Sequence, residues 1–289
     1  MSDDGTAEYL LTQNDCHVFQ CSGSFFAENV EPPSWTNALR NVFGDGHWCL
    51  SLDADEMFIY PHCETISLNT FCRYLDKSGA NALSALVIDM YGDTAILDAT
   101  YQKGQSFLDG CPYFDPELGY KADANGMYPP ELMFSKFRER AFWGGQHRRQ
   151  RPPCITQVPL VNWSKGMGYL VAQHSVNCAR LSDMQGGILH FKFLPGFIEE
   201  IISSIKENSG VAEKGLQERT NYIHTLARNP DLNLRYEQSA RYRDSSQLVK
   251  MKWMKTSPDY EELAAGVTPA APPGKQLRPD MGQLTPPAT

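Results

Sequence analysis

The chain has 289 residues, of which 42% are hydrophobic and 11% aromatic, a composition typical of a globular protein with a substantial core. Its net charge of −8 and its pI near 5.4 argue against a nucleic-acid-binding surface, which needs a basic field. No apolar run approaches the ~20 residues that cross a bilayer, so we expect no transmembrane segment.

The first ninety residues alternate helical and extended patterns. A helix capped among aspartates is predicted over 6–13, followed by the strand His17–Gln20. After two prolines, a second helix is predicted over 34–44, with Ser34 as its N-cap. Its apolar face is expected to pack in the core and contains Trp35, Ala38, Leu39 and Val42. A helix over 67–79 and a strand over 82–90 follow.

Between these helices lies an apolar stretch, residues 47–57, that ends in three carboxylates: Asp53, Asp55 and Glu56. Side chains alternate faces along a strand, so Asp53 and Asp55 point the same way at the carboxyl end, where open α/β sheets bind ligands. Two like charges held that close favour a shared divalent cation, because without one they repel and raise each other's pKa. A solvated acidic turn is the alternative.

The second half of the chain is less regular at first. Residues 101–130 are rich in Gly, Pro, Asp and Tyr, which is typical of a functional lid or an insertion. Strands are then predicted over 134–143, 155–163, 168–174 and 186–193. Three arginines follow the first of these strands and indicate a solvated loop or, alternatively, a diphosphate contact: Arg148, Arg149 and Arg151.

Two helices, over 196–208 and 213–227, are expected to pack over the core. From residue 264 the chain is rich in Ala, Pro and Gly, which predicts a disordered tail. Strands that alternate with helices in this way indicate an α/β protein with a mainly parallel sheet.

Eight cysteines are scattered along the chain, and none forms a C-x-x-C pair. Zinc sites and redox dithiols usually have tight cysteine spacing, so these residues favour buried free thiols in a reducing compartment. The acidic opening Met1-Ser2-Asp3-Asp4 also lacks the pattern of a signal peptide. Together these features predict a cytoplasmic protein.

An ordered set of segments carries a family resemblance. The segments are Asp3-Asp4-Gly5-Thr6-Ala7-Glu8-Tyr9-Leu10, Gly46-His47-Trp48-x-Leu50-x-Leu52-Asp53-Ala54-Asp55-Glu56-x-Phe58, Leu86-Val87-Ile88-Asp89-Met90-Tyr91-Gly92, Pro159-Leu160-Val161-x-Trp163, His174 and Leu189-His190-Phe191-Lys192-Phe193. They resemble glycosyltransferases of the family 2-like, GT-A type, over residues 3–195.

The resemblance implies a domain organisation. A GT-A-like, Rossmann-type and mainly parallel sheet flanked by helices would occupy residues 1–195, a helical extension 196–262 and a disordered Pro/Ala-rich tail 263–289. In the family, a strand, a helix and a second strand precede the first of these segments, whereas here only Met1-Ser2 does. We therefore expect a domain truncated at its N-terminus, without the part that ordinarily holds the nucleotide base.

The resemblance also implies metal-dependent transfer of a sugar from a nucleotide-diphosphate donor to a glycan, a lipid-linked or another acceptor, with peripheral membrane contact in the lipid case. Mn²⁺ or Mg²⁺ would stabilise the charge on the departing diphosphate. Asp55 would bind the metal directly, Asp53 would contact a metal-bound water or the ribose, and His190 would be the third ligand, with His174 as second choice. The further donor contacts would be Asp3, Asp4 and Lys192, the last near the leaving phosphate.

An inverting transfer needs a carboxylate base within reach of the acceptor hydroxyl. Asp89 is the first candidate, since it also ends a strand at the ligand edge, and Asp93 is the alternative. Glu56 is expected to orient the acidic turn. Two other functions stay open: a truncated, inactive relative of these enzymes, and a haloacid-dehalogenase-like phosphatase. The phosphatase expects Thr or Val where this chain has Met57, and a later G-D-x-x-x-D motif, which is missing.

Overall fold

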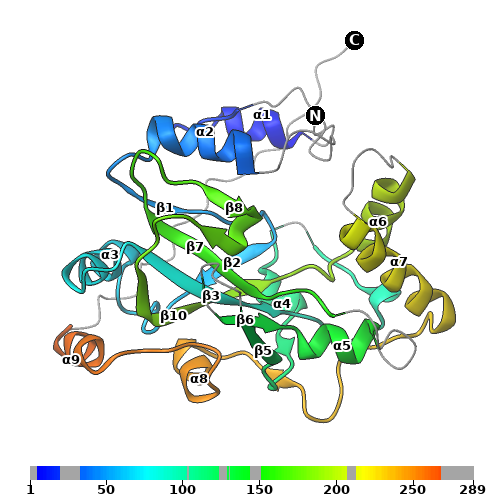
Figure 1. Ribbon diagram of the computed structural model, residues 1–289. Helices are drawn as coiled ribbons and strands as arrows, with labels where there is room; N and C mark the ends of the chain where they lie inside the picture. Colours follow the sequence, from blue (N-terminus) through cyan, green and yellow to red (C-terminus); the bar gives the residue numbers. More distant parts are fainter. Residues whose placement is uncertain are drawn as a thin grey trace.

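The computed structural model describes residues 5–19, 33–102, 104–123, 129, 131–143, 151–206 and 213–267. A five-stranded sheet with the order β1-β7-β3-β10-β2 lies at its centre, surrounded by helices (Figure 1), so the protein is of the α/β class. The strands of this sheet are β1 (Trp48–Leu50), β7 (Thr156–Asn162), β3 (Ala82–Asp89), β10 (Leu181–His190) and β2 (Glu56–Ile59).

Nine helices and three short strand pairs complete the described ranges. The helices are α1 (Thr6–Leu11), α2 (Pro33–Phe43), α3 (Leu68–Lys77), α4 (Phe107–Gly110), α5 (Lys136–Phe142), α6 (Phe197–Lys206), α7 (Glu213–Arg228), α8 (Ser245–Lys250) and α9 (Pro258–Gly266), with 3₁₀ turns η1 (Ile96–Asp98) and η2 (Ala172–His174). The paired short strands are β4 (Tyr113–Phe114) with β11 (Ala240–Arg241), β5 (Tyr120–Asp123) with β6 (Glu131–Phe134), and β8 (Tyr169–Val171) with β9 (Ser175–Val176).

The central sheet is mixed, and the expectation of a mainly parallel sheet is wrong. Only β3 and β10 are parallel, in a register that places Asp89 opposite His190. The other three neighbouring pairs, β1 with β7, β7 with β3 and β10 with β2, are antiparallel. Strand β7 begins beside the carboxyl half of β3, where Thr156 pairs with Leu86, and therefore runs back along it. A parallel pair would need a crossover to the opposite edge of the sheet.

The predicted elements nearest the sheet are confirmed. Every residue of β3 is buried, as expected for the central strand of a sheet covered on both faces. Helix α3 begins after Ser67, whose hydroxyl accepts a hydrogen bond from the Thr70 N–H at 3.2 Å, and buries Phe71 and Leu75. Both the strand and the helix thus arise from local pattern: a mostly apolar run, and a capped stretch with apolar residues four positions apart.

The segment 134–143, predicted as a strand, is mostly helix α5. The Ser135 hydroxyl accepts from the Arg138 N–H at 3.0 Å and so caps the helix. Phe137, Ala141 and Phe142 then recur at helical spacing and pack in an aromatic cluster with residues of α6 and α7. The serine at position 135 is the sequence signal that could have distinguished this helix from a strand.

Other differences lie at the periphery. Residues 17–19 of the predicted strand His17–Gln20 are irregular, and its last residue lies outside the described ranges. In α2, Ala38 and Val42 are exposed, so their expected core packing is wrong. The polar side of α2 faces inward instead: Asn37 Nδ2 donates to the Tyr169 carbonyl at 3.1 Å. Of the predicted strand 168–174, only β8 is extended.

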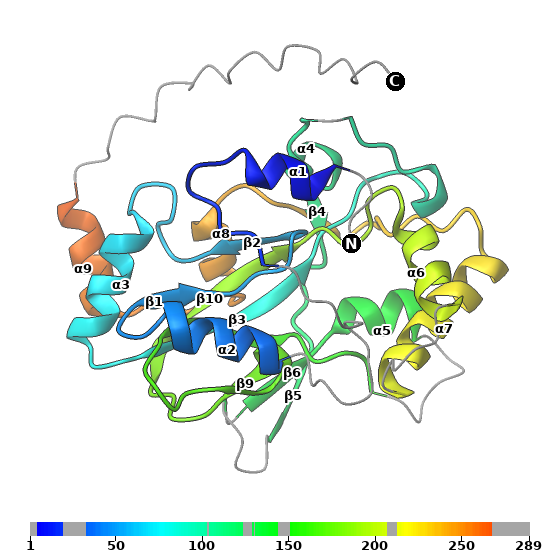
Figure 2. The ribbon, with the colours of Figure 1, turned by 90° about the horizontal axis from the view of Figure 1, so that it is seen from above.

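Helices α6 and α7 confirm the two predicted helices after the sheet, and together with α5 they gather at one end of it (Figures 1 and 2). Helix α9 runs through the first residues of the predicted tail, and residues 268–289 lie outside the described part of the chain. None of the helices described is both long and apolar enough to cross a membrane. All seven cysteines in the described ranges are free thiols, and two of them, Cys72 and Cys111, are fully buried.

Candidate functional site

The acidic turn lies at the edge of the sheet that the sequence predicts. Strands β1 and β2 are at opposite edges of the sheet, and only residues 51–55 join them. This connection therefore passes across the ends of the three strands that lie between them, β7, β3 and β10. The Ser51 N–H donates to the Pro159 carbonyl at 2.9 Å, and the Phe191 N–H donates to the Asp55 carbonyl at 2.8 Å. Asp53 and Asp55 therefore lie over the carboxyl ends of β3 and β10.

Glycine 186 in β10 helps to position the turn. A Cβ atom at this residue would lie 2.9 Å from the Phe58 ring and 3.0 Å from the Ile59 carbonyl oxygen. Only glycine allows β2 to approach β10 this closely. Because Glu56, the first residue of β2, pairs with His190, the last residue of β10, this approach brings the turn to the end of β10.

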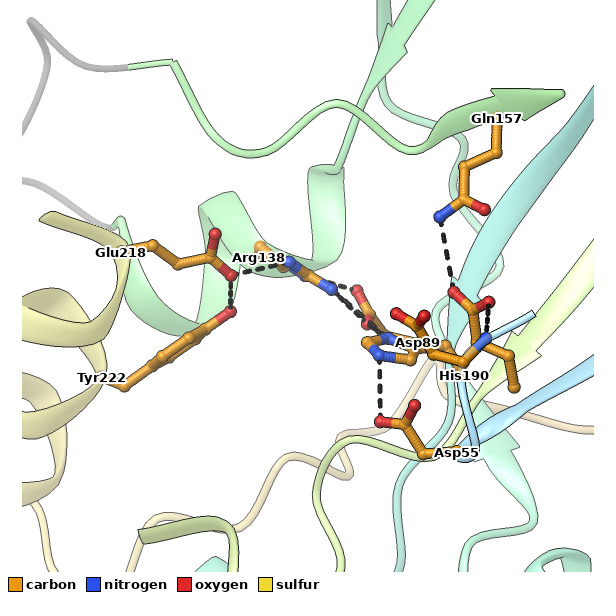
Figure 3. Close-up of polar contacts among 9 residues, drawn as sticks. Asp55, Asp89, Arg138, Gln157, His190, Glu218 and Tyr222 are labelled. Atoms are coloured by element: carbon orange, nitrogen blue, oxygen red, sulfur yellow. Dashed lines mark hydrogen bonds and ion pairs between the residues drawn. The ribbon is translucent and has the colours of Figure 1, made fainter. Parts of the chain in front are cut away.

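His190 lies between two aspartates from different parts of the chain (Figure 3). Its Nε2 is 3.3 Å from Asp55 Oδ2, and its Nδ1 is 2.8 Å from Asp89 Oδ1. The Asp55 side chain is 39% exposed, whereas that of Asp89 is only 1% exposed. The imidazole thus spans from the surface to the interior, with Nε2 on the side of the acidic turn.

The charges of the turn influence one another. Asp53 is exposed, yet partial desolvation of its carboxylate, and then the charge of Asp55, raise the pKa of Asp53. Desolvation would also raise the pKa of Asp55, but the hydrogen bond to His190, the charge of His190 and smaller contributions together outweigh it and lower that pKa. The positive charge of Lys192 acts against desolvation at both carboxyls, although the pKa of Asp53 is raised overall. The structure therefore brings Asp55 and His190 into contact beside Asp53, while the ammonium of Lys192 lies 5.7 Å from the centre of the Tyr222 ring.

Glu56 supports the backbone of the turn. Its Oε2 accepts a hydrogen bond from the Asp53 N–H at 3.0 Å, which fits the expected role in orienting the turn. The other oxygen, Oε1, accepts from Gln157 Nε2 of β7 at 3.4 Å (Figure 3). Glu56 thus fixes the backbone at Asp53, whose carboxylate is exposed, while Asp55 Oδ2 contacts His190.

Asp89 also lies in this cluster, but its predicted role as general base does not fit its surroundings. Arg138 Nε donates to Asp89 Oδ2 and Arg138 Nη2 to Asp89 Oδ1, both at 2.8 Å. Burial alone would raise the pKa of Asp89, but Arg138 and then His190 outweigh it and lower that pKa strongly. A base must be accessible to the acceptor hydroxyl and must take up its proton. Asp89 satisfies neither condition, so this assignment is corrected.

Three residues that sequence reasoning missed complete the buried part of the cluster. Arg138 Nη1 donates to Glu218 Oε1 of α7 at 2.8 Å, and the Tyr222 hydroxyl donates to the same oxygen at 2.5 Å (Figure 3). Burial alone would raise the pKa of Glu218, but the charges of Arg138 and Lys192 and the hydrogen bond from Tyr222 together outweigh it and lower that pKa. Arg and Glu residues on an amphipathic helix usually indicate a solvated face, so no local signal identified Arg138 and Glu218 as buried.

The remaining predicted residues lie elsewhere or outside the described ranges. His174 Nδ1 is 2.6 Å from the Thr156 carbonyl oxygen, and no contact found among the described residues joins it to the acidic turn. The guanidinium of Arg151 lies 5.7 Å from the centre of the Phe134 ring. Four of the predicted donor contacts are among residues that the structure does not describe: Asp3, Asp4, Arg148 and Arg149.

A cavity of about 330 Å³ adjoins the same end of the sheet. Tyr91 and Gly92, just after β3, line one part of it, and Phe193 and Leu194, just after β10, line another. Asp93 also lines the cavity, and its carboxylate is 58% exposed with Arg235 Nη1 at 3.8 Å. Phe193 is three residues from His190, which corresponds to ~10 Å at most along the chain. The cavity and the acidic turn are thus related through the residues that follow β3 and β10, although the turn itself does not line the cavity.

The donor atoms at the acidic turn suit a hard divalent cation. Two carboxylates and an imidazole match Mn²⁺, and the carboxylates match Mg²⁺. Within the described ranges, however, no three such side chains converge closely enough to form a complete metal shell. Asp55 and His190 contact each other directly, so a cation would enter between them and replace the shared proton, with Asp53 beside it. The residues present therefore fit a cation that Asp55 and His190 bind on the protein side and whose remaining coordination positions are filled by a ligand.

Comparisons of the chain with models of protein families, with curated proteins and with solved structures found no match. The functional conclusion accordingly depends on the geometry of this site and on the motifs in the sequence.

Proposed function

We propose that the protein is a metal-dependent glycosyltransferase that moves a sugar from a nucleotide-diphosphate donor to a hydroxyl-bearing acceptor. One observation carries this proposal: the D-x-D turn crosses the carboxyl ends of β3 and β10 and meets His190 there, with Asp55 Oδ2 at 3.3 Å from Nε2. Asp55 and His190 are 135 positions apart in the chain and come together at the edge where open α/β sheets bind ligands. The proposal includes a GT-A-like arrangement of the sheet.

Asp55 and His190 would hold the cation directly, and Asp53 would contact a metal-bound water or the ribose. When bound, Mn²⁺ or Mg²⁺ supplies Lewis-acid stabilisation of the negative charge on the diphosphate. Lys192 adds a positive charge near the two aspartates, where it would contact the leaving phosphate. The protein groups thus place positive charge where negative charge develops during transfer.

The cavity lined by the residues that follow β3 and β10 would receive the acceptor. Asp93 is the carboxylate that we assign as general base, since it lines this cavity and is solvent-accessible, whereas Asp89 is not. A base in this position would accept the hydroxyl proton as the acceptor oxygen forms its bond to the sugar. The glycosidic bond forms while the bond to the diphosphate breaks, and the diphosphate carries away the electron pair.

The test is calorimetry with Mn²⁺ and a panel of nucleotide-diphosphate sugars, together with turnover assays, on the wild type and two variants. Asp55→Ala removes the proposed ligand. Asp183→Ala is the matched control, because Asp183 is an exposed aspartate at the other end of the strand that carries His190. We expect Asp55→Ala to lose metal-dependent binding and turnover while its circular dichroism stays unchanged, and Asp183→Ala to behave as the wild type.

Two results would count against the proposal. Retained metal-dependent turnover in Asp55→Ala would show that the acidic turn does not bind the cation. A wild type that shows no metal-dependent heat with any donor would instead favour an inactive relative of these enzymes.

A further inference from the structure

The buried aspartate at the end of β3 is in contact with His190 but has no access to a substrate, which raises the question of its role. Asp89 Oδ1 accepts from Arg138 Nη2 and lies 2.8 Å from His190 Nδ1, while Oδ2 accepts from Arg138 Nε. An ionised carboxylate can only accept hydrogen bonds. The 2.8 Å contact therefore requires that His190 carries a proton on Nδ1.

Nε2 faces Asp55 Oδ2 at 3.3 Å, so a cation that enters there replaces the proton shared with Asp55 and meets the Nε2 lone pair of a neutral imidazole whose remaining proton is on Nδ1. We propose that Asp89 and Arg138 are positioning residues that hold His190 in this tautomer and ring orientation, so that Nε2 is available as a metal ligand. The part that concerns the metal rests on the proposed function. The part that concerns the tautomer rests on the contacts alone.

Arg138 orients the carboxylate of Asp89 towards the imidazole of His190. Its guanidinium occupies both carboxylate oxygens from one side, which fixes the plane of the carboxylate and leaves Oδ1 directed at the imidazole. Arg138 Nη2 is itself 3.4 Å from His190 Nδ1, but the shorter contact to Asp89 decides which group pairs with the ring. Glu218 holds the far end of the guanidinium at 2.8 Å, so α7 anchors the arrangement.

The chain offers a matched control on the same helix. Arg140, two residues after Arg138, makes the same two-bond contact with Asp115, at 2.9 Å from Nε and 2.8 Å from Nη2. The Asp115 side chain is 2% exposed, as buried as that of Asp89. Asp115→Asn and Asp89→Asn thus remove equivalent buried charges, but only Asp89 contacts His190.

The experiment measures the Mn²⁺ affinity and the position of the ring proton in the wild type, Asp89→Asn and Asp115→Asn. Long-range ¹H–¹⁵N spectra of the metal-free proteins, recorded at alkaline pH where the ring is neutral, show which nitrogen of His190 is protonated. We expect the proton on Nδ1 in the wild type and in Asp115→Asn. In Asp89→Asn, a neutral amide oxygen accepts from Nδ1 more weakly than the carboxylate, and the amide N–H can instead donate to Nδ1, so the proton should shift at least in part to Nε2. Mn²⁺ affinity should then fall ~10- to 100-fold in Asp89→Asn alone.

The proposal is overturned if the wild-type proton lies on Nε2, or if Asp89→Asn keeps both the wild-type tautomer and the wild-type affinity. An equal loss of affinity in Asp115→Asn would also overturn it, since that would indicate a general effect on the fold. A wild type that binds no Mn²⁺ would refute the proposed function, and the ring proton would still decide the positioning role of Asp89.

Discussion

The buried ion network around Arg138 predicts a large loss of stability when its positive charge is removed. Arg138→Met keeps the approximate length of the side chain but removes the guanidinium that pairs with both Asp89 and Glu218, and leaves Asp89 only its contact with His190. The Arg138 side chain is 8% exposed and that of Asp89 is 1% exposed, so water cannot replace the lost partner. Breaking a buried pair in this way costs about 3 to 5 kcal/mol of the free energy of unfolding.

Urea denaturation of the wild type and the variant at neutral pH measures this difference. The control is Lys121→Met, because the Lys121 to Glu131 ion pair has the same 2.8 Å distance but side chains that are 56% and 58% exposed. Such a surface pair contributes about 0 to 1 kcal/mol. If Arg138→Met also lost less than ~1 kcal/mol, burial would not distinguish the two pairs and the reasoning would be refuted.

Three further predictions concern the stability and chemistry of the same regions. The lowered pKa of Glu218 means that its contribution to stability is present above its unfolded pKa of ~4.3 and is lost as the pH falls through the folded pKa. The difference in free energy of unfolding between the wild type and Glu218→Gln should therefore shrink from pH 6 to pH 3 in urea titrations, and a constant difference would contradict this. Asp93→Asn should lower kcat ~10²-fold or more while donor affinity in calorimetry stays unchanged; an unchanged kcat would exclude it as the base. Phe71→Ala should cost about 3 to 5 kcal/mol by thermal unfolding, since this fully buried ring stacks on Tyr60 at 4.6 Å and contacts Tyr260 of α9; a loss under ~1 kcal/mol would mean that the cavity collapses.

Local pattern was sufficient where one segment carries its own signal. The capped helix α3 and the fully buried strand β3 follow from residues within about ten positions of one another. The acidic turn is a partial case: the carboxylates were expected to end a strand, but β1 ends at Leu50, residues 51–55 form the connection and Glu56 begins β2, and the ligand edge stays a prediction. The choice of His190 came from the resemblance, and the 3.3 Å contact with Asp55 agrees with it.

Local pattern failed where long-range partners decide. Asp89 ends a strand at the ligand edge and is on that basis a reasonable base, but Arg138, 49 positions away, covers both of its oxygens. The same holds for α2, where Asn37 and Arg40 face inward to Tyr169, more than a hundred residues later, and Val42 points to solvent. In both places the burial of a polar group is offset by a partner that no spacing in the segment reveals.

The amino-acid sequence by itself determined the α/β class, the position of the acidic turn after a strand, and most helices, because hydrophobic periodicity and capping residues act over one or two turns of chain. Only the tertiary structure decided the mixed strand order and the chain of contacts from Asp55 through His190 and Asp89 to Arg138. These contacts join four separate segments, and a buried charge takes its role from the groups that surround it in space.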